Sequence, residues 1–373
     1  MVIRVIGIFA LLIFCQGIQM NQNESHGPGG GEELSKVSAI GEGKLRYPGG
    51  PFPLFSFGSM LVVDNQELLI YDSAGKYPFY HVNVKEGSLN PHGSWGMGPG
   101  EIENGSPVIL SKTGEHIYAF EMLSQYLHRF DTEFKYQNSM PVDDIIGMFG
   151  VASVLNDQTL FMADYGINLT SKQNQYYFQK YKVENEEISE EYEPALSYDE
   201  HPEYQPLAFN NVLKYGPLAQ SDNEIYAGNL FGSVITGINE TGDNVFQTTM
   251  PEQSPIPDAE PREVNGLLVG EPEQTVFRNI DLAVNKNYVF ALYSGMEASY
   301  EETSKYMTGG EMEDELRIGE ARKIRIYDRH EASYKGEYSL PQWTSVIAAD
   351  NQYLYALVWD LDPYIMVLEL PEL

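Results

Sequence analysis

A short pattern of polar, aliphatic and aromatic positions recurs six times along the chain. In each copy a polar turn precedes an aliphatic and an aromatic residue, and in four copies an alanine follows, as in Ile117-Tyr118-Ala119 and Leu354-Tyr355-Ala356. The aliphatic residues stand at positions 70, 117, 160, 225, 289 and 354. Many of the runs on either side alternate apolar with polar residues, as half-buried strands do. The pattern predicts six repeats built from β-strands.

Each repeat has room for four strands. In the second copy, Pro107–Leu110 precedes the polar turn, Tyr126–Asp131 follows the repeat aromatic residue, and Glu133 lies in a turn that would lead to a fourth strand. Four strands at a period of about 40–65 residues are typical of a β-propeller blade. We therefore expect an all-β fold, a six-bladed β-propeller with four-stranded antiparallel blades. Two β-sandwiches with coincidentally similar spacing are the alternative.

The last repeat supplies only three strands of its blade, ending in the apolar run Tyr364–Leu370. We expect the missing fourth strand to come from the N-terminal part of the chain, within residues 34–46. Pairing of the two chain ends would close the ring and remove an exposed strand edge.

The first fifteen residues have the composition of a signal peptide. Arg4 precedes an apolar run, Val5–Phe14, that is too short to span a bilayer comfortably. Leu12 and Cys15 fit a bacterial lipobox, in which the cysteine becomes the lipid-modified first residue, whereas Phe14 stands where a small residue is usual. Cleavage by an ordinary signal peptidase is the alternative. The sequence thus predicts an exported protein of the periplasm or outer membrane, with Cys15 as its lipidation site.

A polar segment follows the signal peptide. It includes Gly27-Pro28-Gly29-Gly30-Gly31, a composition typical of a flexible tether. We divide the chain into a signal peptide with the lipobox (residues 1–15), a tether that includes the start of the closing strand (residues 16–43) and the propeller (residues 44–373). The tether would hold the propeller away from a membrane surface.

One segment carries a resemblance to a known family. Between Trp95 and Ile102 the chain reads Gly96-Met97-Gly98-Pro99-Gly100-Glu101. This resembles the G-x-G-P-G-E motif of the TolB-like six-bladed propeller lipoproteins of Bacteroidetes, and residues 54–135 are similar to that family throughout. The resemblance implies the fold and a cell-envelope location but no activity, because members of the family are generally uncharacterised envelope proteins.

The glycines of this motif also have an interpretation from their own chemistry. Gly96, Gly98 and Gly100 permit a tight, left-handed connection between blades. A phosphate-binding loop is disfavoured, because Pro99 interrupts the run and no helix is expected after it to hold an anion.

Composition excludes several classes of protein. The formal net charge is −31, which argues against a nucleic-acid binder because such proteins neutralise phosphates with excess Lys and Arg. Hydrophobic residues make up 42% of the chain and aromatic residues 12%, which excludes a disordered protein. With Cys15 as the single cysteine, an intrachain disulfide is excluded.

Catalytic motifs are scarce. The seven histidines form no H-E-x-x-H pair, and no G-x-S-x-G motif occurs. His116 and His128 fall near turn or strand ends, where we expect them at the surface. The acidic runs at residues 184–193 and 311–315 are interpreted as solvated loops. The sequence therefore predicts no catalytic residue, metal site or cofactor; a calcium ion held in the propeller channel by distant loops is the alternative.

Two insertions rich in tyrosine and carboxylates, residues 192–211 and 295–322, enlarge the later repeats. Long loops on a rigid scaffold often carry function, and this composition suits sugars or a protein partner. The candidate binding residues are Tyr198, His201, Tyr204, Tyr300 and Tyr306. Tolerated surface insertions are the plainer interpretation.

These observations favour a binding module over an enzyme. We expect an exported, lipid-anchored β-propeller that binds an envelope protein or a glycan. A propeller enzyme, such as a metal-assisted lactonase, lyase or hydrolase with an acidic central channel, is the alternative, and a structural role in an outer-membrane assembly is a third hypothesis.

Overall fold

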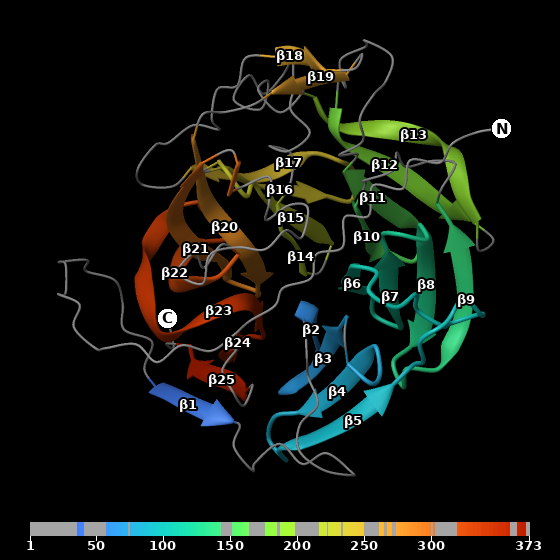
Figure 1. The fold of residues 1–373 in the computed structure, drawn as a ribbon, viewed down its shortest axis with the longest axis horizontal. Coiled ribbons are helices and arrows are strands. Elements are labelled where there is room, and N and C mark those ends of the chain that lie inside the picture. Colours follow the sequence, from blue (N-terminus) through green and yellow to red (C-terminus); the bar gives the residue numbers. More distant parts are fainter. Residues whose placement is uncertain are drawn as a thin grey trace.

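The computed structural model describes residues 36–40, 57–73, 75–142, 151–163, 176–184, 187–197, 216–221, 223–232, 234–249, 261–264, 267–270, 274–299, 301–302, 319–358 and 364–370. Their β-sheets are arranged around a common centre, and each sheet follows its predecessor around the ring (Figure 1). The fold is an all-β propeller, as the sequence predicts. Among these residues, no helix is long and apolar enough to cross a membrane.

Four of the sheets have four strands, each strand antiparallel to the next in the chain. They are β2 (Phe57–Asp64), β3 (Glu67–Asp72), β4 (Phe79–Asn83) and β5 (Ser88–His92); β6 (Val108–Lys112), β7 (His116–Glu121), β8 (Tyr126–Asp131) and β9 (Tyr136–Pro141); β10 (Val151–Asn156), β11 (Thr159–Ala163), β12 (Tyr176–Glu184) and β13 (Glu187–Ser197); and β14 (Leu218–Ser221), β15 (Glu224–Gly228), β16 (Val234–Asn239) and β17 (Asn244–Thr249). The lowest-numbered strand of each sheet lies nearest the centre (Figure 1).

The fifth sheet of the ring has seven strands in the order β1-β25-β24-β23-β22-β21-β20. The strands are β1 (Lys36–Ile40), β20 (Gln274–Val284), β21 (Tyr288–Ser299), β22 (Ala321–Asp328), β23 (Tyr334–Ala349), β24 (Tyr353–Val358) and β25 (Tyr364–Glu369). The 16-residue strand β23 pairs with β22 over its first part and with β24 over its last part, and Thr344 is the residue where the two pairings meet. The described chain therefore shows five sheets in the ring.

The predicted closing strand is confirmed as β1. It pairs antiparallel with β25, so that Val37 lies opposite Leu368 and Ala39 opposite Met366. Figure 1 shows this blue N-terminal strand beside the red C-terminal strands. Because β1 takes the outer place next to β25, the two ends of the described chain are joined by hydrogen bonds. The predicted domain boundaries at residues 15 and 43 lie outside the described residues.

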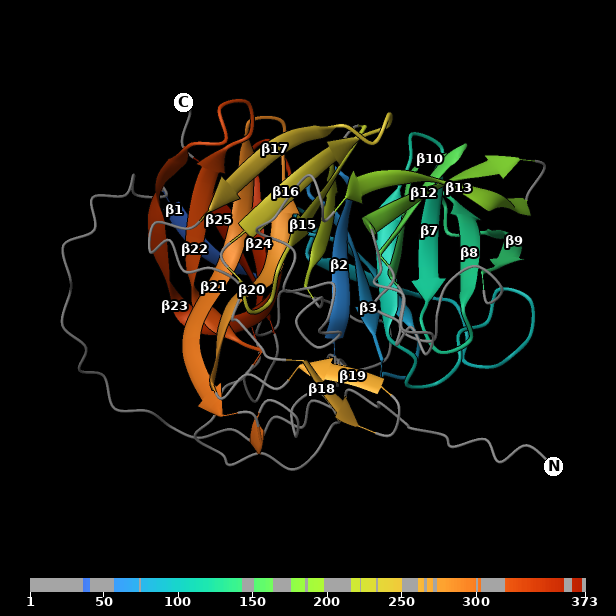
Figure 2. The ribbon, with the colours of Figure 1, turned by 90° about the horizontal axis from the view of Figure 1, so that it is seen from above.

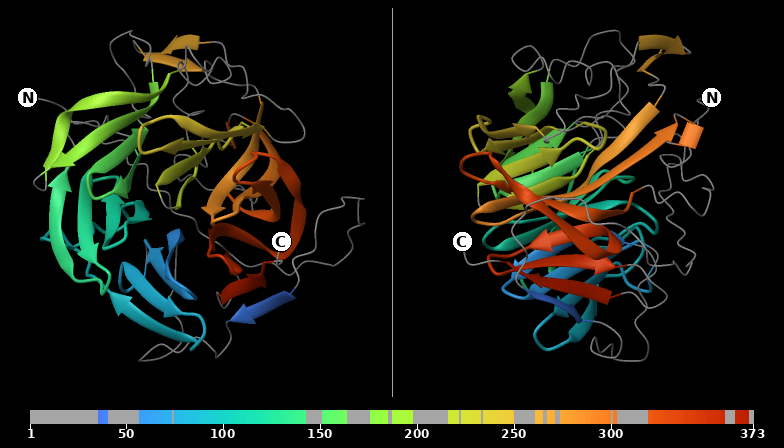
Figure 3. Two further views of the ribbon diagram at one scale, coloured as in Figure 1. Left: turned by 180° about the vertical axis from the view of Figure 1, so that it is seen from behind. Right: turned by 90° about the vertical axis from the view of Figure 1, so that its left-hand side faces the viewer.

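A separate hairpin stands apart from the ring. Strands β18 (Pro261–Val264) and β19 (Leu267–Gly270) form a two-stranded sheet of their own. In Figure 2 this hairpin lies below the sheets, and Figure 3 shows it near the rim.

The repeat residues fill the core between neighbouring sheets. The aromatic residue of the pattern is buried in every copy, for example Tyr118, Tyr226 and Tyr355, each at most 1% exposed. A buried tyrosine needs a partner for its hydroxyl. The Tyr118 hydroxyl donates to Asp157 Oδ1 in the β10–β11 turn at 2.9 Å, and the Tyr355 hydroxyl donates to Asp350 in the β23–β24 turn. The repeated tyrosine thus joins the apolar core to the polar turns.

The glycine motif forms the connection from β5 to β6 and is structural. The carboxylate of Glu101 folds back over the loop, where its Oε2 accepts a hydrogen bond from Gly98 N at 2.9 Å. A Cβ on Gly96 would lie 2.0 Å from the same oxygen. Gly100 has a φ of +76°, and a Cβ there would lie 2.5 Å from the ring of Tyr136. The motif therefore encloses its own carboxylate, in agreement with the structural interpretation.

Candidate functional site

The inner strands of the ring enclose a central channel. A cavity of about 810 Å³ is lined by residues of β2, β6, β14, β20 and β23, which belong to four of the five sheets described in the ring. The backbones converge because every sheet turns the edge of its innermost strand toward the centre (Figure 1).

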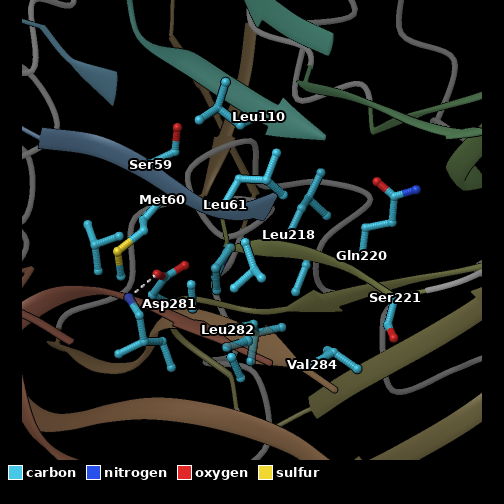
Figure 4. Close-up of a pocket in the computed structure, with 18 of the residues that line it drawn as sticks. Ser59, Met60, Leu61, Leu110, Leu218, Gln220, Ser221, Asp281, Leu282 and Val284 are labelled. Carbon is cyan, nitrogen blue, oxygen red and sulfur yellow. Dashed lines mark hydrogen bonds between the residues drawn. The ribbon is translucent and has the colours of Figure 1, made fainter. Parts of the chain in front are cut away.

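The wall of the channel combines apolar and polar groups. Figure 4 shows side chains from β2, β6, β14 and β20 around the cavity, with Met60, Leu61, Leu110, Leu218, Leu282 and Val284 among them. Polar side chains also line the cavity, and those labelled in Figure 4 are Ser59, Gln220, Ser221 and Asp281. A concave site that offers both apolar surface and polar groups can bind and orient a small ligand.

One mouth of the channel is formed by the polar turns of the repeat, and we call it the turn mouth. Its cavity-lining residues are Asp64, Asn65, Lys112, Ser221, Asn285, Lys286, Asp350 and Asn351. Hydrogen bonds join these turns from one part of the ring to the next. Asn285 Nδ2 donates to the Asp350 carbonyl at 3.0 Å, and Lys286 N donates to Asn351 Oδ1 at 3.1 Å. The polar half of the sequence repeat thus builds a hydrogen-bonded rim.

Gln220 links three sheets at this rim. Its Oε1 accepts a hydrogen bond from Lys112 N at 3.1 Å, and its Nε2 donates to the Leu155 carbonyl at 3.0 Å. The Lys112 ammonium in turn donates to the Val63 carbonyl. Both polar side chains are therefore occupied in holding the rim together.

Asp281 is placed differently, because it lies on the channel wall away from the turns. Its Oδ2 accepts a hydrogen bond from Ile347 N at 2.7 Å, across the gap between β20 and β23 (Figure 4), and the carboxylate also accepts one from Leu282 N. Protein surrounds the carboxyl group, although the side chain is partly exposed to the cavity. Burial raises the pKa of Asp281 to about 7, and the two backbone hydrogen bonds offset only part of that shift.

The register shows how unusual this aspartate is. Asp281 lies opposite Leu292, three residues beyond the repeat aliphatic residue of β21. The corresponding pairs in two other repeats are Ile109 with Phe120 and Val346 with Leu357. An acidic residue therefore occupies a position that is aliphatic in those copies. Sequence reasoning missed Asp281, and this departure within the repeat is the signal that could have found it.

The candidate site residues from the sequence cannot be compared with the channel. Cys15, Tyr198, His201, Tyr204, Tyr300 and Tyr306 all lie outside the described residues. Their roles in lipidation and binding remain predictions. Within the described part of the chain, no group of three or more His, Cys, Asp and Glu side chains could hold a metal ion.

The predicted surface position of His128 is wrong. Its side chain is 5% exposed and its Nε2 donates to Glu121 Oε2 at 3.0 Å, while its Nδ1 lies 2.8 Å from Ser139 Oγ. Glu121 Oε1 accepts a further hydrogen bond from Glu103 N at 2.7 Å. A strand of the ring has a neighbouring sheet on each face, so that a polar residue in the alternating pattern can face protein instead of solvent. His116 is partly exposed and contacts Asp157.

Comparisons with known proteins agree on the fold. A member of the DUF4221 family from Bacteroides vulgatus matches with a TM-score of 0.53 at 9% identity, covering 90% of this chain and 98% of that chain. The likeness concerns the fold alone. A candidate exported protein from Bacteroides fragilis (TM-score 0.49, 12% identity, 90% and 95% covered) and a gluconolactonase from Xanthomonas campestris (0.45, 10%, 90% and 89%) are similar to a smaller degree. No family model and no curated protein matches the sequence.

Proposed function

We propose that this protein is an exported, lipid-anchored β-propeller that binds a small ligand in its central channel. The observation that carries the proposal is the cavity of about 810 Å³ at the centre of the ring, which is lined by both apolar and polar side chains. Ligand pockets typically have volumes of about 300–1,000 Å³.

Six blades are part of the proposal. The long strand β23 would serve two blades, as the outer strand of β20–β23 and, through its last residues, as the inner strand of a blade completed by β24, β25 and β1. Both units then have the four strands of a propeller blade, and the six copies of the sequence repeat support this division.

The location follows from the N-terminal segment and from the family resemblance. An apolar run that ends at Cys15, followed by a glycine-rich tether, supports export to the periplasm or outer membrane and lipid attachment. The net charge of −31 would repel the propeller from anionic membrane surfaces, so that contact would occur through the tether. Mass spectrometry of the mature N-terminus tests this part: a diacylated cysteine at position 15 is expected, and a chain that begins at a later, unmodified residue contradicts lipidation.

The channel can be tested with dansylamide, a neutral fluorophore whose emission rises in apolar sites. We expect saturable binding to the full propeller. Leu218→Trp should weaken it because the larger ring would project into the cavity, whereas Val245→Trp should not, because Val245 is 42% exposed on β17. Equal binding by both variants, or none by the wild-type protein, would contradict the channel as the binding site.

We propose the tyrosine-rich insertions as a second binding region for partners. Tyr198, His201, Tyr204, Tyr300 and Tyr306 are proposed to contact a glycan or an envelope protein, because tyrosine both stacks and donates hydrogen bonds. A glycan array and a pull-down from envelope fractions test this. Hits that disappear when the tyrosines are replaced by alanine are expected, whereas an array and a pull-down without hits would contradict it.

The enzyme hypothesis requires several carboxylates and a histidine that converge at one mouth. The described lining of the channel includes Asp64, Asp281 and Asp350 but no histidine. The binding proposal therefore rests on the cavity, and the propeller enzyme stays the alternative.

A further inference from the structure

We infer that the channel ligand is a small molecule with an apolar body and one protonated amine, and that its ammonium group pairs with Asp281. The inference rests on the proposed function, since it assigns a chemical class to the ligand of the same cavity.

The first argument is the remaining hydrogen-bonding capacity of Asp281. An ionised carboxylate offers about four acceptor positions. Only the backbone N–H groups of Ile347 and Leu282 are bonded to it among the described residues. Figure 4 shows one carboxylate oxygen directed at the backbone nitrogen and the other turned away from it. The carboxylate can therefore accept hydrogen bonds from a group inside the cavity.

The second argument is the missing countercharge. None of the ion pairs in the described part of the chain involves Asp281. A carboxylate that is taken out of water without a cationic partner is costly to the folded state. The lining has two lysines, Lys112 and Lys286, and the ammonium of Lys112 donates to the Val63 carbonyl at the turn mouth. A ligand ammonium would supply a cationic partner that none of the described residues provides.

The third argument is the field of the whole molecule. The net charge is −31, and a strongly negative molecule attracts cations over a long range. The turn mouth itself carries charges of both signs, because Lys112 and Lys286 lie there beside Asp64 and Asp350. An anionic ligand would meet repulsion from the net charge and at Asp281. A cation is therefore favoured on entering the channel and after binding.

The apolar part of the lining favours a ligand with an apolar body. Leu61, Leu110 and Leu218 line the cavity and are only partly buried, whereas Leu282 packs into the core between sheets (Figure 4). The apolar body of an organic amine gains from leaving water against these leucines.

Three fluorophores of one scaffold test the inference: dansylcadaverine (a primary amine), dansylamide (neutral) and dansylglycine (an anion). At pH 8 we expect dansylcadaverine to bind the full-length protein about tenfold or more tightly than dansylamide, the size expected for a hydrogen bond to a charged group. Dansylglycine should bind most weakly. Equal or reversed affinities for the amine and the neutral probe would overturn the inference.

Two variants connect the preference to Asp281. Asp281→Asn keeps an oxygen for Ile347 N but removes the charge, and it should abolish the preference for the amine while retaining dansylamide binding. Asp243→Asn, in the exposed β16–β17 turn, removes the same charge far from the cavity lining and should retain the preference. Retention of the preference in Asp281→Asn would overturn the role of this carboxylate.

The outcomes separate the two proposals. One outcome is that dansylamide binds the wild-type protein more tightly than Leu218→Trp while dansylcadaverine binds no more tightly than dansylamide. In that case the channel remains a binding site and the inference about the amine is wrong. If none of the three probes binds, both proposals are contradicted.

Discussion

Two buried carboxylates of this propeller have opposite surroundings. Glu121, between the first and second sheets of the ring, bonds to His128 and to Glu103 N, whereas Asp281, on the channel wall, bonds to two backbone N–H groups and no side chain among the described residues. Burial alone would raise the pKa of either group. Hydrogen bonds from His128 and Glu103 N bring the pKa of Glu121 below its ordinary value despite its burial, while burial raises that of Asp281 to about 7.

The difference shows how a buried charged group can be interpreted. The carboxylate of Glu121 is satisfied within the protein, so it stabilises the fold in the ionised form. The carboxylate of Asp281 costs stability in the ionised form, so it is better explained by something that binds. Fully partnered polar clusters indicate structure, and a charge that lacks a partner beside a cavity indicates function.

The largest effect is expected from His128→Ala. Glu121 would lose its side-chain partner in a site that is 3% exposed, and breaking such a pair costs about 3 kcal/mol of unfolding free energy. Urea unfolding at pH 7 measures this, with His330→Ala, an exposed histidine, as the control. A loss below about 1 kcal/mol would show that Glu121 does not depend on His128.

The same variant has a predicted pH signature. Because the folded pKa of Glu121 is lowered, its contribution to stability is present above its unfolded pKa and is lost as the pH falls through the folded pKa. In His128→Ala this acid-side loss should be smaller than in the wild-type protein. An unchanged loss between pH 5 and pH 3 would contradict the assignment.

Asp281→Asn should do the opposite and stabilise the ligand-free protein. A carboxyl group whose folded pKa is raised to about 7 favours the folded state at low pH, and this advantage is lost as the pH rises through 7. We expect a gain of about 2 kcal/mol for the variant at pH 8, roughly half the value of the full shift, because the side chain is partly open to the cavity. The gain should shrink toward zero between pH 7 and pH 4.

The other charged groups on the cavity lining affect the midpoint of this profile. They are Asp64, Lys112, Lys286 and Asp350. The unfolding series can be repeated in an Asp64→Asn background to test the influence of one of these groups. The stabilisation by Asp281→Asn should persist in that background. A variant that is destabilised at every pH would show that the ionised Asp281 is needed by the fold, which contradicts the comparison with Glu121.

Sequence could predict the ring but not these two sites. The repeat and its closing strand could be predicted from local patterns such as Ile117-Tyr118-Ala119, because strand alternation and turn formation depend on residues that are neighbours in the sequence. His128 meets Glu121 and Ser139 only through strand pairing, and Asp281 meets Ile347 only across two inner strands. Contacts of this kind depend on register and on the packing of one sheet against the next, which a single sequence does not specify.

The smallest effect is expected from Ser139→Ala, at the outer end of the Glu121 cluster. Its hydroxyl lies 2.8 Å from His128 Nδ1 and 2.9 Å from the Tyr136 hydroxyl, and it is less buried than the histidine. Loss of one such hydrogen bond costs about 1 kcal/mol. Because His128 still donates to Glu121, the acid-side pH dependence of unfolding should match the wild-type profile. A loss as large as that of His128→Ala would mean that Ser139 holds the imidazole in place, and the stability of the ionised Glu121 would then depend on the whole chain of hydrogen bonds instead of on its nearest partner.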